Sequence, residues 1–209
     1  MPPEPIQRTY AVIPAGGKSV RMGRPKLALP LGGRIVLERV IGALCQARIK
    51  HILLVVGPHV AELAPLAEAA GADVLLLAEE TADMRATIEY GLHWLEEHFH
   101  PGPEDDWLLV PGDHPTLDPA VVRQLLETRA ADPTHSLVVP TFEGRRGHPT
   151  LIGWKHVARI RALPIGQGLN TYLRQHAAET REVAVPSADI LCDLDTPEDY
   201  ERLQRSWSG

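Results

Sequence analysis

A glycine-rich segment with basic residues, AGGKSVRMGRPK at residues 15–26, could hold a nucleotide. Small residues let backbone N–H groups approach a phosphate or a base edge, and Arg21 and Lys26 can neutralise negative oxygens. The segment is not a Walker A loop, because that motif needs a glycine where Val12 stands, and it contains no Gly-x-Gly-x-x-Gly fingerprint. We predict a nucleotide cradle, with a glycine-rich turn carrying solvated basic residues as the alternative. The candidate nucleotide-binding residues are Ala15, Gly16, Gly17, Ser19, Arg21 and Lys26.

A carboxylate, Asp113, follows a short apolar run at residues 107–110. If the first four predicted strands lie in the order third, second, first, fourth, then the first and fourth strands are neighbours. The loop after residue 13 and Asp113 then face one crevice at the carboxyl end of the sheet. A carboxylate in this place can hold Mg²⁺ beside a triphosphate. Asp113 could instead only cap a turn.

An acidic segment, LCDLDTPED at residues 191–199, combines a helix start with two further carboxylates. Thr196 as N-cap, a proline after it and Asp199 as the capping-box acid predict the beginning of a helix. A cap does not require Asp193 or Asp195, so both are candidates for the second metal ligand. We favour Asp195 as the ligand, together with Asp113.

Two arginines in a glycine-flanked loop, GRRGHP at residues 144–149, could receive a second substrate. Guanidinium groups form paired hydrogen bonds with phosphates and other planar anionic groups. Arg145, Arg146 and the following His148 are therefore the candidate acceptor-binding residues. A solvated basic turn is the alternative.

Apolar runs alternate with segments of helical periodicity along the chain. Strands are predicted at residues 10–13, 52–56, 74–77, 107–110, 137–139, 150–152 and 182–185, and helices over residues 36–44, 60–70, 83–98, 119–130, 154–161 and 169–177. Alternation of this kind indicates parallel strands covered by helices on both faces. We predict an α/β fold: a single-domain, Rossmann-like three-layer sandwich with a mostly parallel sheet.

Length and charge limit the classes of function. A chain of 209 residues suits one domain, which we place at residues 6–206 after a frayed start at residues 1–5. The formal net charge of −6 gives the chain no general attraction to nucleic acid or anionic lipid. No apolar stretch approaches the roughly 20 residues of a membrane helix, and the start lacks signal-peptide features. We expect a cytoplasmic protein that binds neither nucleic acid nor membrane.

Four motifs occur in order along nearly the whole chain: AGGKSVRMGRPK, GDHP at residues 112–115, GRRGHP and DLDTPED at residues 193–199. Together they resemble the small nucleotidyltransferases of molybdenum-cofactor biosynthesis, the MobA/MocA-like group. The resemblance implies a fold of the nucleotide-diphospho-sugar transferase type. GRRGHP and DLDTPED look most like the cytidylyltransferase branch, which transfers CMP from CTP to the terminal phosphate of molybdopterin.

The resemblance also implies roles for particular residues. Gly16 and Gly17 would lie at the nucleotide, Arg21 and Lys26 on its phosphates, and Asp113 with Asp195 on Mg²⁺. The list of candidate catalytic residues is therefore Arg21, Lys26 and Asp113. No general base is required, because the attacking phosphate is already an anion.

The expected partners are an NTP, a phosphorylated acceptor such as molybdopterin, and transiently a molybdoenzyme or its chaperone. Three alternatives stay open. The double glycine Gly16-Gly17 is a guanylyltransferase feature, so GTP could replace CTP. The acceptor could be a different phosphorylated molecule. The chain could also be a non-catalytic nucleotide-binding module.

Overall fold

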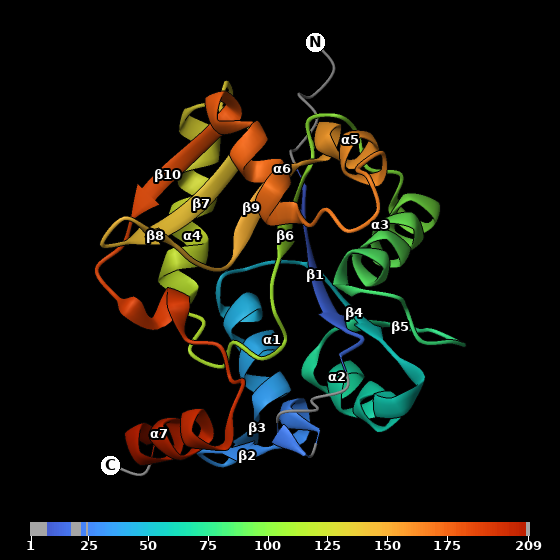
Figure 1. The fold of residues 1–209 in the computed structure, drawn as a ribbon, viewed down its shortest axis with the longest axis vertical. Coiled ribbons are helices and arrows are strands. Elements are labelled where there is room, and N and C mark those ends of the chain that lie inside the picture. The colour runs from blue at the N-terminus through green and yellow to red at the C-terminus, as the bar shows by residue number, and fades with distance from the viewer. Residues whose placement is uncertain (1–7, 18–21, 24, 208–209) are drawn as a thin grey trace.

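Strand β1 (Thr9–Ala15) sends alternate side chains into two separate hydrophobic cores. Ala11 and Ile13 pack into one core, and Tyr10 and Val12 pack into the other. This alternation is the period-two pattern of a strand that is covered on both faces. The computed structural model, which describes residues 8–17, 22–23 and 25–207, therefore has helices on both sides of a central sheet (Figure 1).

The central sheet has the strand order β10-β7-β9-β6-β1-β4-β5, with β8 paired to β7. Its other strands are β4 (His51–Val56), β5 (Asp73–Leu76), β6 (Asp106–Leu109), β7 (Leu137–Phe142), β8 (Arg145–Arg146), β9 (Thr150–Gly153) and β10 (Thr180–Ala184). Strand β9 runs antiparallel to both β6 and β7, and β8 runs antiparallel to β7. The remaining pairs are parallel. A short separate hairpin consists of β2 (Pro30–Leu31) and β3 (Arg34–Ile35).

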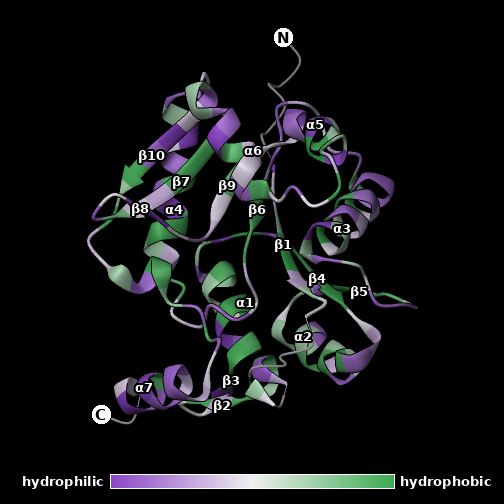
Figure 2. Cartoon of the chain, viewed as in Figure 1, coloured by the Kyte–Doolittle hydropathy of each residue, from purple (hydrophilic) through white to green (hydrophobic). Residues whose placement is uncertain are grey.

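The helices form the two outer layers. The first core takes side chains from α1 (Val36–Gln46), α2 (Ala64–Ala70), α4 (Pro119–Ala131) and α7 (Pro197–Trp207). The second core takes side chains from α3 (Met84–Phe99), α5 (Val157–Arg161) and α6 (Leu169–Gln175). Helix α7 lies beside the β2–β3 hairpin (Figure 1), and the ribbon of strand β4 is largely hydrophobic (Figure 2). The chain is thus a three-layer α/β domain, as predicted.

The predicted order of the first four strands is confirmed, because β5, β4, β1 and β6 are neighbours in that sequence. Two predicted helices begin as 3-10 helices. The segment 154–161 is the 3-10 helix η4 (Trp154–His156) followed by α5. The segment 60–70 is a 3-10 helix η3 (Pro58–Leu63) followed by the shorter α2. Val60 has non-helical backbone angles, and Pro65 lies at the start of α2. Proline in a helix interior removes a hydrogen bond and clashes with the preceding turn, so the α-helix begins only there.

No helix within residues 8–17, 22–23 and 25–207 is long and apolar enough to cross a membrane.

Candidate active site

The carboxyl ends of β1 and β6 place two loops side by side. The two strands are parallel, and the N–H of Val110 continues their ladder by donating to the carbonyl of Val12 at 3.0 Å. The next loop packs closely, because a Cβ on Gly112 would lie 3.2 Å from side-chain atoms of Ile13 and Leu27. Asp113 therefore emerges beside the loop that follows β1, as the predicted strand order requires.

Lys26 joins two carboxylates from distant parts of the chain. It opens the short 3-10 helix η2 (Lys26–Ala28), and its Nζ donates to Asp113 and, at 3.0 Å, to Oδ1 of Asp195. The three side chains keep 18%, 19% and 33% of their surface exposed, in the same order. Burial opposes the charge on Lys26, but the two carboxylates outweigh it and raise the pKa of the ammonium group. Three charges thus converge at a partly open position.

The capping motif fixes the backbone at Asp195. One carboxylate oxygen of Asp199 accepts hydrogen bonds from the N–H groups of Asp195 and Thr196, at 3.2 and 2.9 Å. The Thr196 hydroxyl oxygen in turn accepts from the N–H of Asp199 at 3.2 Å. This is the reciprocal cap that the sequence predicts, and α7 begins at the next residue. The cap does not use the side chain of Asp195, which is directed to Lys26.

Asp193, the other candidate ligand, has a different partner. Its carboxylate oxygen Oδ1 lies 3.4 Å from Nδ1 of His114, whose side chain is only 1% exposed. Partial burial raises the pKa of Asp193, but the hydrogen bond from His114 and the charge of Lys26 outweigh it and lower the pKa. The structure therefore pairs Asp195, rather than Asp193, with Asp113 on one ammonium group.

A cavity of about 270 Å³ lies against the end of β1 and the start of α3. Its lining comprises Pro14, Gly16, Gly17, Thr81, Ala82, Asp83, Met84 and Thr87. A Cβ on Gly16 would lie 2.7 Å from Oγ1 of Thr87 and 3.2 Å from Oγ1 of Thr81, so only glycine fits there without displacement. The side chain of Asp83 caps α3 by accepting from the N–H of Ala86.

The predicted nucleotide-binding residues are only partly placed. Gly16 and Gly17 line the cavity, and Ala15 is the buried last residue of β1. Ser19 and Arg21 lie outside the described residues, so their roles stay predictions. Sequence reasoning did not single out Thr81 and Thr87, because isolated threonines without a recognisable spacing give no signal. Their position before and within the first turn of a predicted helix is the feature that could have indicated them.

Arg85 is a further residue that sequence reasoning missed. Its Nη1 donates to the carbonyl groups of Leu163, Pro164 and Gln167, at 2.9, 3.0 and 3.2 Å. These contacts fasten the loop between α5 and α6 to the start of α3, next to the cavity wall. Ile165, within this loop, is 97% exposed.

The three predicted acceptor-binding residues separate in the structure. Arg146 donates from Nε to Oε1 of Glu182 on β10 at 2.8 Å, and Arg145 is exposed. His148 instead lies close to the carboxylates: its ring centroid is 6.3 Å from that of His114. Burial lowers the pKa of the His148 ring. The charge of Asp193 raises this pKa by a smaller amount, so the pKa is lowered overall. Only His148 among the three thus lies beside the charged cluster.

The carboxylates of Asp113 and Asp195 are the residues of this cluster that could hold Mg²⁺. Mg²⁺ is usually held by one or two carboxylates, with substrate phosphates and waters completing the shell. Within the described part of the chain, no group of three or more His, Cys, Asp or Glu side chains could hold a metal ion. A closed site of the zinc type is therefore absent from those residues, and two partly exposed carboxylates are the kind of protein ligand that Mg²⁺ uses together with substrate phosphates.

The family match identifies the class of protein, a nucleotidyltransferase. The chain matches the family described as MobA-like NTP transferase domain over residues 11–180, and it belongs to this family. This match confirms the resemblance to the MobA/MocA-like group that the sequence motifs indicate.

Two curated relatives carry different nucleotides in their names. Over 210 residues, the chain is 31% identical to the phosphoenolpyruvate guanylyltransferase of Rubrobacter xylanophilus, with 94% of each chain covered. Over 133 residues, it is 32% identical to the 2-C-methyl-D-erythritol 4-phosphate cytidylyltransferase of Stenotrophomonas maltophilia. That match covers 62% of this chain and 56% of the relative's length.

Solved structures share the fold over almost the whole chain. Rv0371c of Mycobacterium tuberculosis matches with a TM-score of 0.77 at 26% identity, covering 95% of this chain and 98% of the other. A cytidylyltransferase from Leptospira borgpetersenii matches with a TM-score of 0.75, covering 97% of this chain and 87% of the other. Its identity of 16% shows a shared fold alone.

Proposed function

We propose that this chain transfers CMP from CTP to the terminal phosphate of molybdopterin and releases pyrophosphate, with Mg²⁺ as cofactor. The observation that carries the proposal is the convergence of Lys26, Asp113 and Asp195 at the carboxyl edge of the sheet. A cavity bounded by Gly16 and Gly17 opens at the same edge. We assign the charged cluster to the phosphates of the nucleotide and the glycine-lined cavity to its base.

In the proposed reaction, an oxygen of the acceptor phosphate attacks the α-phosphorus of the nucleotide. The new P–O bond forms as the bond to the bridging oxygen breaks, and the electron pair leaves with pyrophosphate. Lys26 neutralises charge on the phosphoryl oxygens, a task that we also assign to Arg21 from the sequence. Asp113 and Asp195 would hold Mg²⁺, which supplies further charge neutralisation at the phosphates when bound. No side chain needs to remove a proton.

The choice of CTP rests on the GRRGHP and DLDTPED motifs and agrees with the name of the cytidylyltransferase relative. GTP is the second candidate. The double glycine Gly16-Gly17 favours it, as does the guanylyltransferase relative that matches along 94% of the chain. Gly16 lines the cavity together with Thr81 and Thr87, and we assign this cavity to the base.

Pyrophosphate release tests the base and the acceptor together. Purified protein with Mg²⁺ is given CTP or GTP, each with molybdopterin, phosphoenolpyruvate or 2-C-methyl-D-erythritol 4-phosphate. We expect release only with CTP and molybdopterin, with a cytidylylated product by mass spectrometry. Preference for GTP would overturn the base, and preference for another acceptor would overturn molybdopterin. Nucleotide binding without turnover for any acceptor would favour the non-catalytic module.

If the product is a nucleotidylated molybdopterin, a molybdoenzyme or its chaperone must take it over. We include a transient contact with such a protein in the proposal. Retention of labelled product by this chain until a molybdoenzyme is added would support it, and spontaneous release at the same rate would count against it.

A further inference from the structure

The second carboxylate of the site lies on a segment that belongs to no strand or helix of the structure. Asp195 falls between the 3-10 helix η6 (Ala188–Leu191) and α7. Such a segment needs contacts of its own to hold a side chain in place, because regular backbone hydrogen bonding does not fix it. The contacts around residues 190–195 therefore decide where this carboxylate lies.

Two contacts hold the segment against the loop of Asp113, and a third holds it against the GRRGHP loop. The N–H of Leu194 donates to the carbonyl of Asp113 at 2.9 Å, and Asp193 pairs with the buried ring of His114. On the other side, the N–H of His148 donates to the carbonyl of Ile190 at 2.9 Å. The two aspartates that point to Lys26 are thus tied together through their neighbours in the sequence.

The second glycine of the GRRGHP motif, Gly147, allows the close approach between this motif and the segment at Ile190. A Cβ on Gly147 would collide with the backbone of Ile190, so only glycine allows the two segments to approach this closely. The ring of His148 then lies against the ring of His114, nearly perpendicular to it at 72°. The GRRGHP motif therefore contacts both the ring of His114 and the segment that carries Asp195.

We propose that the His114–Asp193 pair is a positioning element that holds Asp195 opposite Asp113, so that the two carboxylates can bind one divalent ion. In this arrangement Asp193 is a positioning residue and Asp195 is a ligand. Loss of a group that orients a metal ligand typically lowers the metal affinity by roughly 10- to 100-fold. The inference rests on the proposed function, because it assumes the metal site at Asp113 and Asp195.

Titration of the full chain with Mn²⁺, followed by electron paramagnetic resonance without nucleotide and again with CTP, tests the inference. We expect Asp193→Ala and His114→Ala to raise the dissociation constant for Mn²⁺ by roughly tenfold. Asp193→Asn keeps an oxygen that can accept from His114, so it should stay within about threefold of the wild type. Asp195→Asn removes a ligand and should abolish the site. Asp189→Asn, an exposed acid in the neighbouring 3-10 helix η6, controls for lost charge.

Each result distinguishes the positioning pair from the metal site itself. Loss of Mn²⁺ binding in Asp193→Asn as complete as in Asp195→Asn would make Asp193 a ligand and overturn the inference. Wild-type binding by Asp193→Ala would also overturn it, while loss in Asp195→Asn would leave the proposed function standing. Equal behaviour of the wild type and Asp195→Asn would overturn both.

Turnover supplies a second measurement that a general loss of structure would not reproduce. In Asp193→Ala, saturating Mg²⁺ should restore most of kcat, while the Mg²⁺ concentration for half-maximal rate rises by roughly tenfold. Because Asp193 is partly exposed, this variant should fold even if His114→Ala does not. A loss of kcat that no Mg²⁺ concentration restores would contradict a positioning role.

Discussion

The two ends of the parallel strands carry polar clusters that differ in exposure and in composition. At the carboxyl end, the side chains of Lys26, Asp113 and Asp195 form a charged cluster, and each keeps between 18% and 33% of its surface exposed. At the amino end, Asp106 and Arg129 form an ion pair at 3.1 Å with 2% and 6% of their side chains exposed. The guanidinium of Arg129 also donates to the carbonyl of Pro133 at 3.2 Å.

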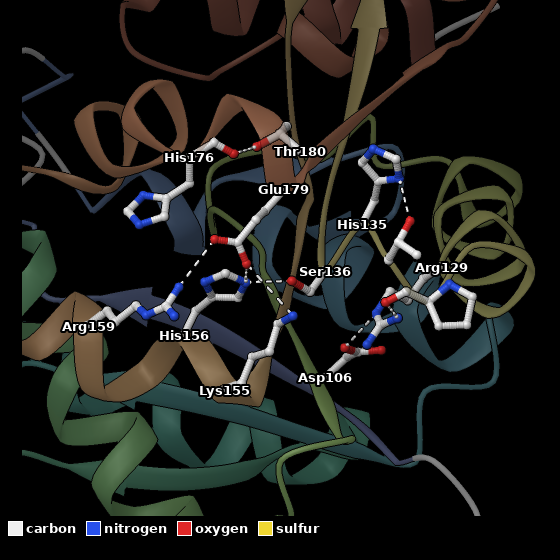
Figure 3. Close-up of polar contacts among 12 residues, drawn as sticks. Asp106, Arg129, His135, Ser136, Lys155, His156, Arg159, His176, Glu179 and Thr180 are labelled. Carbon is white, nitrogen blue, oxygen red and sulfur yellow. Dashed lines mark hydrogen bonds and ion pairs between the residues drawn. The ribbon is translucent and has the colours of Figure 1, made fainter.

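A second group of polar contacts, centred on the buried ring of His156, lies near this ion pair (Figure 3). The ring of His156 contacts Oγ of Ser136 at 2.6 Å through Nε2 and the hydroxyl of Tyr172 at 2.7 Å through Nδ1. Glu179 lies 3.8 Å from His156 and also pairs with Arg159 at 3.2 Å. Ser136 and His156 are fully buried, so no substrate can reach this serine–histidine pair.

The difference separates polar groups that hold the fold from polar groups that can do chemistry. The Asp106–Arg129 pair joins β6 to α4. The contacts of His156 join the 3-10 turn before α5 to Ser136, the residue before β7, and to Tyr172 on α6. Buried polar groups of this kind are costly to leave unpaired. At the carboxyl end, by contrast, two acids and a base meet at a surface that solvent and substrate can reach.

Loss of Arg129 should produce the largest effect on stability. Arg129→Met leaves the carboxylate of Asp106 buried beside an apolar side chain, which typically costs about 3–5 kcal/mol. We expect the free energy of unfolding in urea to fall by that amount, while the KM for nucleotide of the folded fraction stays unchanged. Arg123→Met, an exposed arginine on the same helix, is the control.

A second substitution sharpens this prediction. Removing both charges in Asp106→Leu/Arg129→Met should recover much of the lost stability, because a buried pair contributes little net stability over apolar side chains. If Arg129→Met unfolds like Arg123→Met, the amino-end pair does not hold the fold and the comparison fails.

Asp113→Asn should show the opposite pattern. The proposed site loses a charge that holds Mg²⁺, so turnover should fall by about 10²–10³, by analogy with the loss of a group that stabilises transition-state charge. The unfolding free energy should change little, because the side chain is partly exposed. Steady-state kinetics and urea unfolding measure the two effects. Glu104→Gln, an exposed acid before β6, should alter neither, and full activity of Asp113→Asn would remove this residue from the site.

The amino-end network should make stability depend on pH. Burial lowers the pKa of His156 to about 4; Glu179 opposes this shift, and the charges of Lys155, Arg159 and His176 add to it. Between the unfolded pKa of about 6.5 and pH 4, only the unfolded chain binds this proton. Stability should therefore fall by about 3 kcal/mol as the pH drops through this range.

Urea unfolding at pH 7 and pH 4.5 measures this dependence. His156→Gln cannot titrate, so its stability should change less between the two pH values than that of the wild type. His93→Gln, on the surface of α3, should keep the wild-type slope. Equal slopes for all three proteins would show that His156 does not control the pH dependence.

The carboxyl-end site was largely predictable because its signals are local. Continuous apolar runs indicate parallel strands, and the carboxyl-end rule then brings Asp113 and the segment after β1 together. The cap at Thr196 and Asp199 identifies the helix start. Because the cap does not require Asp195, this residue is available as a ligand. The pairing of Asp193 with His114 was not predictable, because it depends on how two irregular loops meet.

The amino-end network gave no signal in the sequence. Arg129 falls in a predicted helix, where an arginine is most often solvated, and Ser136, His156 and Tyr172 are single polar residues far apart in the chain. The antiparallel direction of β9 was also not predicted. It follows from the tight turn after β7, which returns the chain along the same side of the sheet.

Arg146 belongs neither to the buried amino-end contacts nor to the charged cluster at Lys26. Its substitution should have the smallest effect on stability. Its pair with Glu182 is partly exposed, so Arg146→Gln should change the unfolding free energy by less than about 1 kcal/mol. If this arginine binds the acceptor, as the GRRGHP motif predicts, the acceptor KM should rise roughly tenfold, equivalent to about 1.4 kcal/mol, while kcat persists. Glu182→Gln breaks the same pair but keeps the guanidinium, so its acceptor KM should not rise. Equal acceptor KM values for both variants and the wild type would make this arginine a surface residue of β8, and among the three predicted acceptor-binding residues only His148 would remain beside the charged cluster.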